Sequence, residues 1–319
     1  MSAGVEGHRG HGHGKVILVG EHAVVHGHAA IAAGLKGGIT VVASPGTGRL
    51  EVPAWSLTAT ADDGSAVGRA LAAVLARFDA RAWDFSAEAA IPSRAGVGSS
   101  AALAVALARA AARATGREDE GLVAAAVADA EAVFHGTASG IDAAAAMSGA
   151  VGRFTRAEGW RPIRVLQPMT ICVGLSGRPR DTSAQVAGVR RLCERLPAAD
   201  GVLALLGRLA DDAQEALGVG DVDGLGRILD TAHGLLAALR VSSPELDALV
   251  HDARAAGAVG AKLTGAGGGG AVIALAPGHE RDVLARWRAA GFEGFLAEIA
   301  ATEPKSAIPA GIRSSEGAR

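Results

Sequence analysis

The stretch Pro92-Ser-Arg-Ala-Gly-Val-Gly-Ser-Ser-Ala-Ala102 leads directly into an alanine-rich segment with helical character. Two glycines and two hydroxyls therefore stand at the start of a helix, where four backbone N–H groups lack internal partners. Such a helix end carries partial positive charge and readily holds a phosphate. Gly96 and Gly98 let the backbone come close to a ligand, while Ser99 and Ser100 add hydroxyls for phosphate oxygen or magnesium. The stretch predicts a nucleotide-phosphate loop.

Two other interpretations of this stretch are open. Either serine could simply be the N-cap of a packed helix. Gly96, Gly98 and Ala101 also fit the dinucleotide fingerprint G-x-G-x-x-A of an NAD-dependent dehydrogenase. That fingerprint requires a second strand and an acidic residue about 20 positions later. The sequence instead predicts a second helix from Glu118 to Phe134, which weakens the dinucleotide interpretation. The P-loop pattern G-x-x-x-x-G-K-[ST] is absent from the chain.

The composition bounds the class of protein. The 319 residues suffice for two domains with a large core, and 49% of them are hydrophobic. A net charge of −2 provides no field that would attract nucleic acid or an acidic membrane. We find no apolar stretch of membrane-spanning length and no signal peptide pattern. The two cysteines, Cys172 and Cys193, form no C-x-x-C pair, which favours a reducing, cytoplasmic location.

Hydrophobic periodicity predicts an α+β fold rather than a regular βαβ alternation. The His/Gly-rich segment from Gly7 to Gly14 is expected to be a disordered tail that leads into the first strand. Strands are expected at 15–20, 29–35, 38–43, 85–91 and 169–175, after a glycine turn within 260–275, and at 292–299. Helices are expected at 64–78, 99–114, 118–134, 142–147, 182–196, 201–217, 221–239, 243–256 and around 287. We expect domains at 1–166 and 167–302 and a flexible tail at 303–319.

Two carboxylates stand at helix ends where they can carry chemistry. Glu131 is expected near the C-terminal end of its helix, where the dipole disfavours a carboxylate by roughly 0.3–1 kcal/mol. Its position indicates a nearby cation, either a basic side chain or a metal. Asp142 follows a glycine-containing loop, and Ser139-x-x-Asp142 is itself a capping-box pattern. A carboxylate fixed at such a helix start could also accept a proton from a hydroxyl.

Further candidates flank the first strand and a second glycine-rich stretch. Lys15, Glu21 and His22 stand at the two ends of the first strand, where each could also be a solvated strand-end residue. Lys262-Leu-Thr-Gly-Ala-Gly-Gly-Gly-Gly270 leads into a strand rather than a helix, so its G-x-G-x-x-G is no dinucleotide fingerprint. It holds more glycines than a hairpin needs. This favours close approach of the backbone to a ligand or to the first glycine loop.

Together these stretches resemble the three motifs of the GHMP kinase superfamily, in order and at fitting separations. The segment from Gly14 to Gly27 resembles the mevalonate kinase branch, because a galactokinase would show Glu-His-Thr-Asp where this chain has Glu21-His-Ala-Val24. The segments 135–142, 181–189 and 241–247 resemble that branch as well. The resemblance implies a ribosomal protein S5 domain 2-like N-terminal domain and a ferredoxin-like C-terminal domain, with the active site in the cleft between them.

The resemblance also implies an activity, namely ATP- and Mg²⁺-dependent phosphorylation of the C5 hydroxyl of mevalonate in isoprenoid biosynthesis. Asp142 would be the catalytic carboxylate, and Lys15 would lower the pKa of the accepting hydroxyl. Ser100 and Glu131 would hold Mg²⁺. ATP would contact Pro92, Arg94, Ala95, Gly96, Val97, Gly98, Ser99, Ser100 and Ala101. The substrate would contact Lys15, Glu21, His22, Ser139, Asp142, Thr182, Gly265, Ala266 and Gly267, and a homodimer is expected.

Some positions depart from the usual pattern of the superfamily. Ala138 stands where Pro is usual, Ala143 where Asn often follows the catalytic Asp, Ala150 where a second Gly is common, and Val97 where Leu is usual. These changes bear on loop rigidity and substrate fit rather than on the class of reaction.

Other functions on the same fold stay open at this point. A phosphomevalonate kinase, a mevalonate 3-kinase or a sugar kinase would share the motifs. A phosphorylated substrate would need further cations, for which Arg94, Arg178 and Arg180 are candidates. A non-catalytic nucleotide-binding relative is less consistent with the sequence, since both Lys15 and Asp142 are present.

Overall fold

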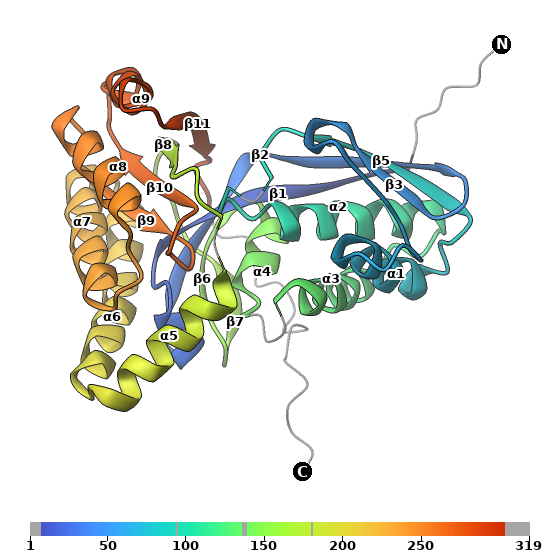
Figure 1. The fold of residues 1–319 in the computed structure, drawn as a ribbon, viewed down its shortest axis with the longest axis horizontal. Helices are drawn as coiled ribbons and strands as arrows, with labels where there is room; N and C mark the ends of the chain where they lie inside the picture. Colours follow the sequence, from blue (N-terminus) through green and yellow to red (C-terminus); the bar gives the residue numbers. More distant parts are fainter. Residues whose placement is uncertain (1–7, 94, 136–138, 180, 304–319) are drawn as a thin grey trace.

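The computed structural model describes residues 8–93, 95–135, 139–179 and 181–303. Two halves lie side by side, each with its own sheet and its own helices (Figure 1). The first half runs from β1 to β7, and the second half runs from β8 to β11. Sequence reasoning correctly predicted this α+β architecture.

The first half contains a seven-stranded sheet in which β2 is the central element. The path of paired strands is β4-β3-β5-β2-β6-β7, and β1 pairs with β2 along the other edge of that strand. Helices α1 to α4 lie together on one side of this sheet (Figure 1). The strands are β1 (His8–Val19), β2 (Ala30–Pro45), β3 (Arg49–Val52), β4 (Leu57–Thr60), β5 (Trp83–Ala89), β6 (Val151–Thr155) and β7 (Gly159–Pro162). The helices are α1 (Ala66–Phe78), α2 (Ser99–Ala114), α3 (Glu120–His135) and α4 (Ile141–Ser148), with the short 3₁₀ turns η1 (Ala23–His26) and η2 (Pro53–Trp55).

The expectation of a disordered tail before residue 15 was wrong from His8 onward. Residues 8–13 pair with residues 38–43 of β2, so β1 is twice as long as hydrophobicity predicted. The alternation of glycine and histidine has a packing reason. A Cβ atom on Gly10 would lie 2.0 Å from the carbonyl oxygen of Ala106, and one on Gly12 would lie 2.1 Å from that of Ala102. The glycines therefore let α2 lie directly against the strand.

Helix α2 is central to the first half, and its alanines explain why so many elements can pack closely around it. Its residues from Ala101 to Ala108 are all buried, because the small side chains allow β1, β2, α1 and α3 to approach it closely. The next helix, α3, begins two residues later than expected. Asp119 caps it by accepting a hydrogen bond from the N–H of Leu122 at 2.7 Å.

The second half is a four-stranded antiparallel sheet in the order β11-β8-β10-β9, covered by helices. Counting its strands along the chain, this order is 4-1-3-2 with βαββαβ connectivity, which confirms the expected ferredoxin-like arrangement. Trp287 lies at the core of this half, where its indole N–H donates to the carbonyl of Leu249 at 2.8 Å. The strands are β8 (Met169–Leu175), β9 (Gly260–Thr264), β10 (Ala271–Leu275) and β11 (Glu293–Ile299). The helices are α5 (Thr182–Arg195), α6 (Ala198–Val219), α7 (Val222–Ala238), α8 (Pro244–Ala255) and α9 (Glu280–Ala289).

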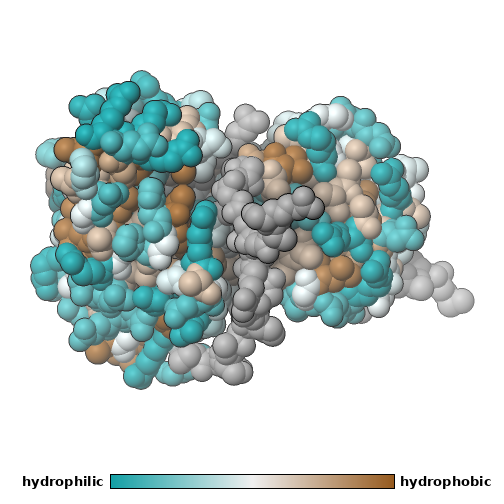
Figure 2. All heavy atoms as spheres, turned by 90° about the horizontal axis from the view of Figure 1, so that it is seen from below, coloured by the Kyte–Doolittle hydropathy of each residue, from teal (hydrophilic) through white to brown (hydrophobic). Residues whose placement is uncertain are grey.

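The change from one sheet to the other falls between Pro162, the end of β7, and Met169, the start of β8. We propose on this basis that the domain boundary lies at 166/167. The flexible tail expected at 303–319 falls, apart from Glu303, outside the described residues. Hydrophilic side chains dominate the visible outer surface of both halves, with small apolar areas between them (Figure 2). None of the described helices is both long and apolar enough to cross a membrane.

Candidate active site

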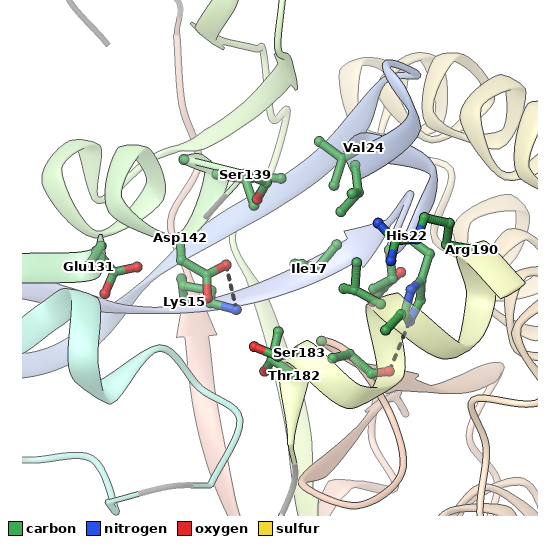
Figure 3. A pocket seen from close by; sticks show the side chains of 18 residues that line it. Lys15, Ile17, His22, Val24, Glu131, Ser139, Asp142, Thr182, Ser183 and Arg190 are labelled. Atoms are coloured by element: carbon green, nitrogen blue, oxygen red, sulfur yellow. Dashed lines mark hydrogen bonds and ion pairs between the residues drawn. The ribbon is translucent and has the colours of Figure 1, made fainter. Parts of the chain in front are cut away.

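A cavity of about 400 Å³ lies where β1, α4, α5 and the second glycine-rich loop meet. Its wall brings together nine of the residues predicted from the sequence: Lys15, Glu21, His22, Glu131, Ser139, Asp142, Thr182, Gly265 and Ala266. It also contains residues that sequence reasoning did not select: Ile17, Val24, Val25, Gly140, Ile141, Ser183, Val186, Ala187 and Arg190. Figure 3 shows an ionic end with Lys15, Asp142 and Glu131, and an opposite end with His22 and Arg190.

At the ionic end, Lys15 and Asp142 form an ion pair with 2.9 Å between Nζ and Oδ1. The Lys15 side chain is 1% exposed, whereas that of Asp142 is 28% exposed and lines the cavity. Asp142 stands in the first turn of α4, whose N-cap is Gly140 with a φ of 87°. The capping box expected from Ser139 is therefore not formed. Glycine at the cap position leaves the carboxylate of Asp142 directed at Lys15 instead (Figure 3).

The predicted phosphate loop packs directly on Lys15. The N–H of Lys15 donates to the carbonyl of Val97 at 2.8 Å, and a Cβ on Gly98 would lie 2.6 Å from Cγ of the lysine. Gly98, with a φ of 75°, is the N-cap of α2. The interpretation of a serine N-cap was therefore wrong, since Ser99 and Ser100 are the first two residues of the helix itself.

The remaining predicted nucleotide ligands lie along this same loop and helix start, apart from Arg94, which is outside the described residues. Pro92, Ala95, Gly96 and Ala101 belong to it, but none of the described loop residues lines the cavity. Helix α2 is followed by α3 with no strand between them, so the dinucleotide interpretation was wrong as well. The nucleotide roles of these residues stay a prediction.

Glu131 is a buried carboxylic acid beside the ion pair. Its side chain projects from α3, and none of the described residues donates a hydrogen bond to its Oε1. Burial, together with the negative charge of Asp142, raises its pKa to about 7, although Lys15 and a hydrogen bond with Ser100 oppose this. The cation that the sequence predicted near Glu131 thus includes Lys15. The metal-ligand role of Glu131 stays a prediction.

The opposite end of the cavity is built for a different group. The Nε2 of His22 lies 2.9 Å from the carbonyl oxygen of Ala266, which can only accept, so Nε2 carries the proton. Burial lowers the pKa of His22, and its Nδ1 is therefore an acceptor. Arg190 adds a positive charge, while Ile17 and Val24 lie between the two ends (Figure 3).

Arg190 was missed by sequence reasoning, although a signal was present. Thr182, Val186 and Arg190 are spaced at i, i+4 and i+8, so they share one face of α5, and all three line the cavity. Thr182 had been predicted as a substrate ligand. Extending the same face by two turns would have found the arginine.

Glu21 and Gly267, both predicted as substrate contacts, each interact with other parts of the protein. Glu21 is 1% exposed and forms an ion pair with Lys262, a fully buried residue of β9. Gly267 is not part of the cavity wall. A Cβ on it would lie 2.0 Å from the carbonyl oxygen of Val241, so this glycine serves the packing of its loop against the chain after α7. The substrate contacts predicted for both residues stay predictions.

Comparison with known proteins places this geometry in a family context. The family model described as GHMP kinases N terminal domain matches residues 65–150, and the one described as GHMP kinases C terminal matches residues 213–293. A curated mevalonate kinase of Pyrococcus horikoshii is 35% identical over 87% of this chain and 91% of its own length. That of Aeropyrum pernix is 37% identical over 82% of this chain and 86% of its own length.

Solved structures show the same likeness in three dimensions. The crystal structure of L. major mevalonate kinase in complex with R-mevalonate aligns with a TM-score of 0.82 at 28% identity, covering 92% of this chain and 96% of that one. A Methanococcus jannaschii mevalonate kinase aligns with a TM-score of 0.79 at 22% identity, covering 92% of this chain and 98% of its own. At that identity it supports the fold alone.

Proposed function

The chain belongs to the GHMP kinase family, and from this premise we propose that it transfers the terminal phosphoryl group of ATP to the C5 hydroxyl of mevalonate. The observation that carries the proposal is the Lys15–Asp142 pair at 2.9 Å, with its carboxylate open to the cavity and its lysine packed under the phosphate loop. One catalytic pair thus lies between a site for phosphate and a site for an alcohol.

Phosphoryl transfer requires positioning and charge stabilisation more than covalent chemistry. In the proposed reaction, Asp142 accepts the proton of the attacking hydroxyl. The ammonium group of Lys15 stabilises the negative charge that moves between the hydroxyl oxygen and the phosphoryl group. The N-terminal end of α2 carries partial positive charge, which favours the negatively charged phosphates. Gly96 and Gly98 allow the backbone to approach them without a side chain in between.

The residues present fit a Mg²⁺ ion. Glu131 has a buried oxygen without a hydrogen-bond donor among the described residues, and its neighbour Ser100 provides a hydroxyl. Magnesium in phosphoryl-transfer sites is bound through one or two carboxylates together with substrate phosphates. When bound, it would neutralise charge on the transferring phosphate. Glu131 and Ser100 are the residues that we propose to hold it.

The two ends of the cavity match the two ends of the proposed acceptor. Mevalonate carries a primary hydroxyl at one end, a carboxylate at the other, and a methyl and a hydroxyl group between them. With the primary hydroxyl at Asp142, the carboxylate reaches toward Arg190, which pairs favourably with it. Nδ1 of His22 can accept a hydrogen bond from the central hydroxyl, and Ile17 and Val24 offer apolar contact to the methyl group.

The alternative of a phosphorylated acceptor finds less support in the described part of the chain. Arg178, a candidate for binding a second phosphate, is not part of the cavity wall and pairs with Glu245 at 2.7 Å. The other two candidates, Arg94 and Arg180, lie outside the described residues. Apart from Lys15, Arg190 is the single Lys or Arg side chain in the described cavity wall, and one cation suits a carboxylate.

The test is a coupled assay of ADP release with purified protein, ATP and Mg²⁺, offering mevalonate, phosphomevalonate and a panel of sugars separately. We expect turnover with mevalonate and a product phosphorylated on the C5 oxygen, identified by phosphorus NMR. Turnover with phosphomevalonate or a sugar but not with mevalonate would contradict the proposal. Product phosphorylated at the C3 oxygen would identify a mevalonate 3-kinase instead. Arg190→Leu should raise the KM for mevalonate at least about tenfold, because it removes the charge that faces the carboxylate.

Two further expectations from the sequence belong to this proposal. The free thiols Cys172 and Cys193 support a reducing, cytoplasmic location. The homodimer rests on the family resemblance. Light scattering of the purified protein will measure its mass in solution.

A further inference from the structure

The strand that carries Lys15, β1, has the paired strand β2 along one of its two edges and none of the described strands along the other. Backbone groups of alternate residues therefore point away from the sheet. At Lys15, the N–H on this free edge donates to the carbonyl of Val97. Two residues further along, the corresponding groups of Ile17 need partners from elsewhere, since they are buried.

Thr264 of β9 supplies both of these partners. Its Oγ1 accepts from the N–H of Ile17 at 2.9 Å and donates to the carbonyl oxygen of the same residue at 3.0 Å. Thr264 is fully buried and belongs to the second half of the molecule. One hydroxyl group thus provides hydrogen bonds to both the N–H and the carbonyl group that Ile17 presents on the free edge of β1.

Lys262, two residues earlier on β9, contacts both Ile17 and the segment that follows β1. Its ammonium group forms the buried ion pair with Glu21 and also lies 3.4 Å from the carbonyl oxygen of Ile17. A third contact comes from the loop that follows β9, where the carbonyl of Ala266 accepts from His22. Residues 262–266 therefore contact residues 17–22 through side chain and backbone together.

We propose that Thr264 and Lys262 are positioning residues that set the place of Lys15 through β1. Neither of them lines the cavity, so their effect on turnover passes through the strand. The free edge of β1 is secured by Val97 at Lys15 and by Thr264 at Ile17, which leaves the catalytic lysine little freedom along the strand. Misplacement of a reacting group by about 1 Å can cost on the order of 100-fold in rate. The second half thereby controls a catalytic group of the first.

The experiment compares Thr264→Val with Thr264→Ser. Valine has nearly the same shape as threonine but cannot bond to Ile17, and serine keeps the hydroxyl. We expect Thr264→Val to lower kcat about 10- to 100-fold, with the KM for ATP and for mevalonate changed less than about threefold. Thr264→Ser should stay within about threefold of the wild type. If Thr264→Val does not fold, Thr264→Ala takes its place with the same expected outcome.

A matched control comes from a different contact between the halves. Lys36 of β2 pairs with Glu298 of β11 through side chains that are both exposed. Lys36→Ala should leave kcat unchanged, because it removes an exposed contact between the halves that does not run through Thr264 or Ile17. A Thr264→Val protein that melts at a lower temperature but turns over at the wild-type kcat when folded would show a purely structural role and overturn the proposal.

The inference rests on the proposed function for its kinetic readout, and a second readout separates the two. A crystal structure of Thr264→Val should show the Lys15 ammonium displaced from Asp142. If that structure keeps the pair at its 2.9 Å separation, the positioning role is wrong, whichever acceptor the enzyme uses. Absence of mevalonate-dependent turnover in the wild type would instead remove the proposed substrate, and the displacement of Lys15 would still be measurable.

Discussion

Two buried lysines each pair with a carboxylate in this protein, and the two pairs differ in what their carboxylates can reach. Both carboxylates belong to the cavity wall, but Asp142, the partner of Lys15, is 28% exposed, whereas Glu21, the partner of Lys262, is only 1% exposed. We call these the open pair and the closed pair. The open pair lies within the first half, and the closed pair joins the first half to the second.

The same two chemical groups thus serve different purposes because of their surroundings. In the open pair, Asp142 can exchange a proton with a molecule in the cavity. In the closed pair, burial raises the pKa of Glu21 and lowers that of Lys262, while each charge stabilises the other. A pair buried in this way gives little net stability compared with apolar residues, but breaking it is costly. We expect that it helps to fix one arrangement of the two halves.

The largest effect is expected from breaking the open pair. Asp142→Ala should lower kcat about 10³- to 10⁴-fold, because it removes the base that accepts the proton of the hydroxyl. ATP should still bind, since the phosphate loop is untouched. Single-turnover kinetics and calorimetric titration with ATP measure the two quantities. Retention of more than about a tenth of the wild-type kcat would refute the role of Asp142 as the base.

Breaking the closed pair should affect stability most. Lys262→Met leaves the carboxylate of Glu21 buried without its partner, at an expected cost of about 3–5 kcal/mol in the free energy of unfolding. Urea denaturation followed by circular dichroism measures this loss. The double variant Glu21→Leu with Lys262→Met should recover most of it, because no charge is then left unpaired. If the double variant were as unstable as Lys262→Met, the loss of stability would not come from leaving the charge of Glu21 unpaired.

Glu131 allows a finer test of the electrostatics around the open pair, because both Lys15 and Asp142 influence its pKa. Its pKa of about 7 lies above the ordinary 4.5, so the folded protein without ligand binds a proton more tightly than the unfolded chain. This contribution to stability is fully present below about pH 4.5 and is lost as the pH rises through about 7. Relative to Glu131→Gln, the wild type should therefore lose stability across this range, as urea titrations at several pH values will show.

Binding of Mg²⁺ should respond to pH in the opposite direction, because it needs the ionised carboxylate. The magnesium concentration for half-maximal rate should fall as the pH rises through about 7 in the wild type. Glu131→Gln should raise that concentration at least about tenfold and remove this pH dependence. An unchanged magnesium requirement in the variant would exclude Glu131 as a ligand.

The smallest effect is expected from a third, exposed pair. Lys36 and Glu298 join β2 to β11 with side chains that are 59% and 56% exposed. Lys36→Ala should change the free energy of unfolding by less than about 1 kcal/mol, because exposed ion pairs contribute little. The same urea titration, carried out beside Lys262→Met, tests this. If Lys36→Ala lowered the free energy of unfolding as much as Lys262→Met does, burial would not explain the difference between these two ion pairs.

Local patterns in the sequence determined much of this protein. Glycines and serines before an alanine-rich helix predicted the start of α2, and apolar periodicity predicted most helices. Periodicity found only half of β1 and divided the single strand β2 into two. Asp142 and Glu131 were selected because their residue types and positions limit the chemistry that they can perform, whereas the role of Lys15 came from the family resemblance. Those properties are local to a few residues, and a sequence displays them directly.

Only the tertiary structure decided which distant residues meet. The glycines of residues 8–14 looked like a tail, because the helix that packs on them lies about a hundred residues away in the chain. Lys262 and Thr264 belong to the glycine-rich stretch that the sequence singled out, but nothing in that stretch indicated their partners Glu21 and Ile17, which belong to the other half. The open and closed pairs each consist of a lysine and a carboxylate, so their residue types do not distinguish them. Burial separates them, and burial is a property of the packed chain rather than of any segment within it.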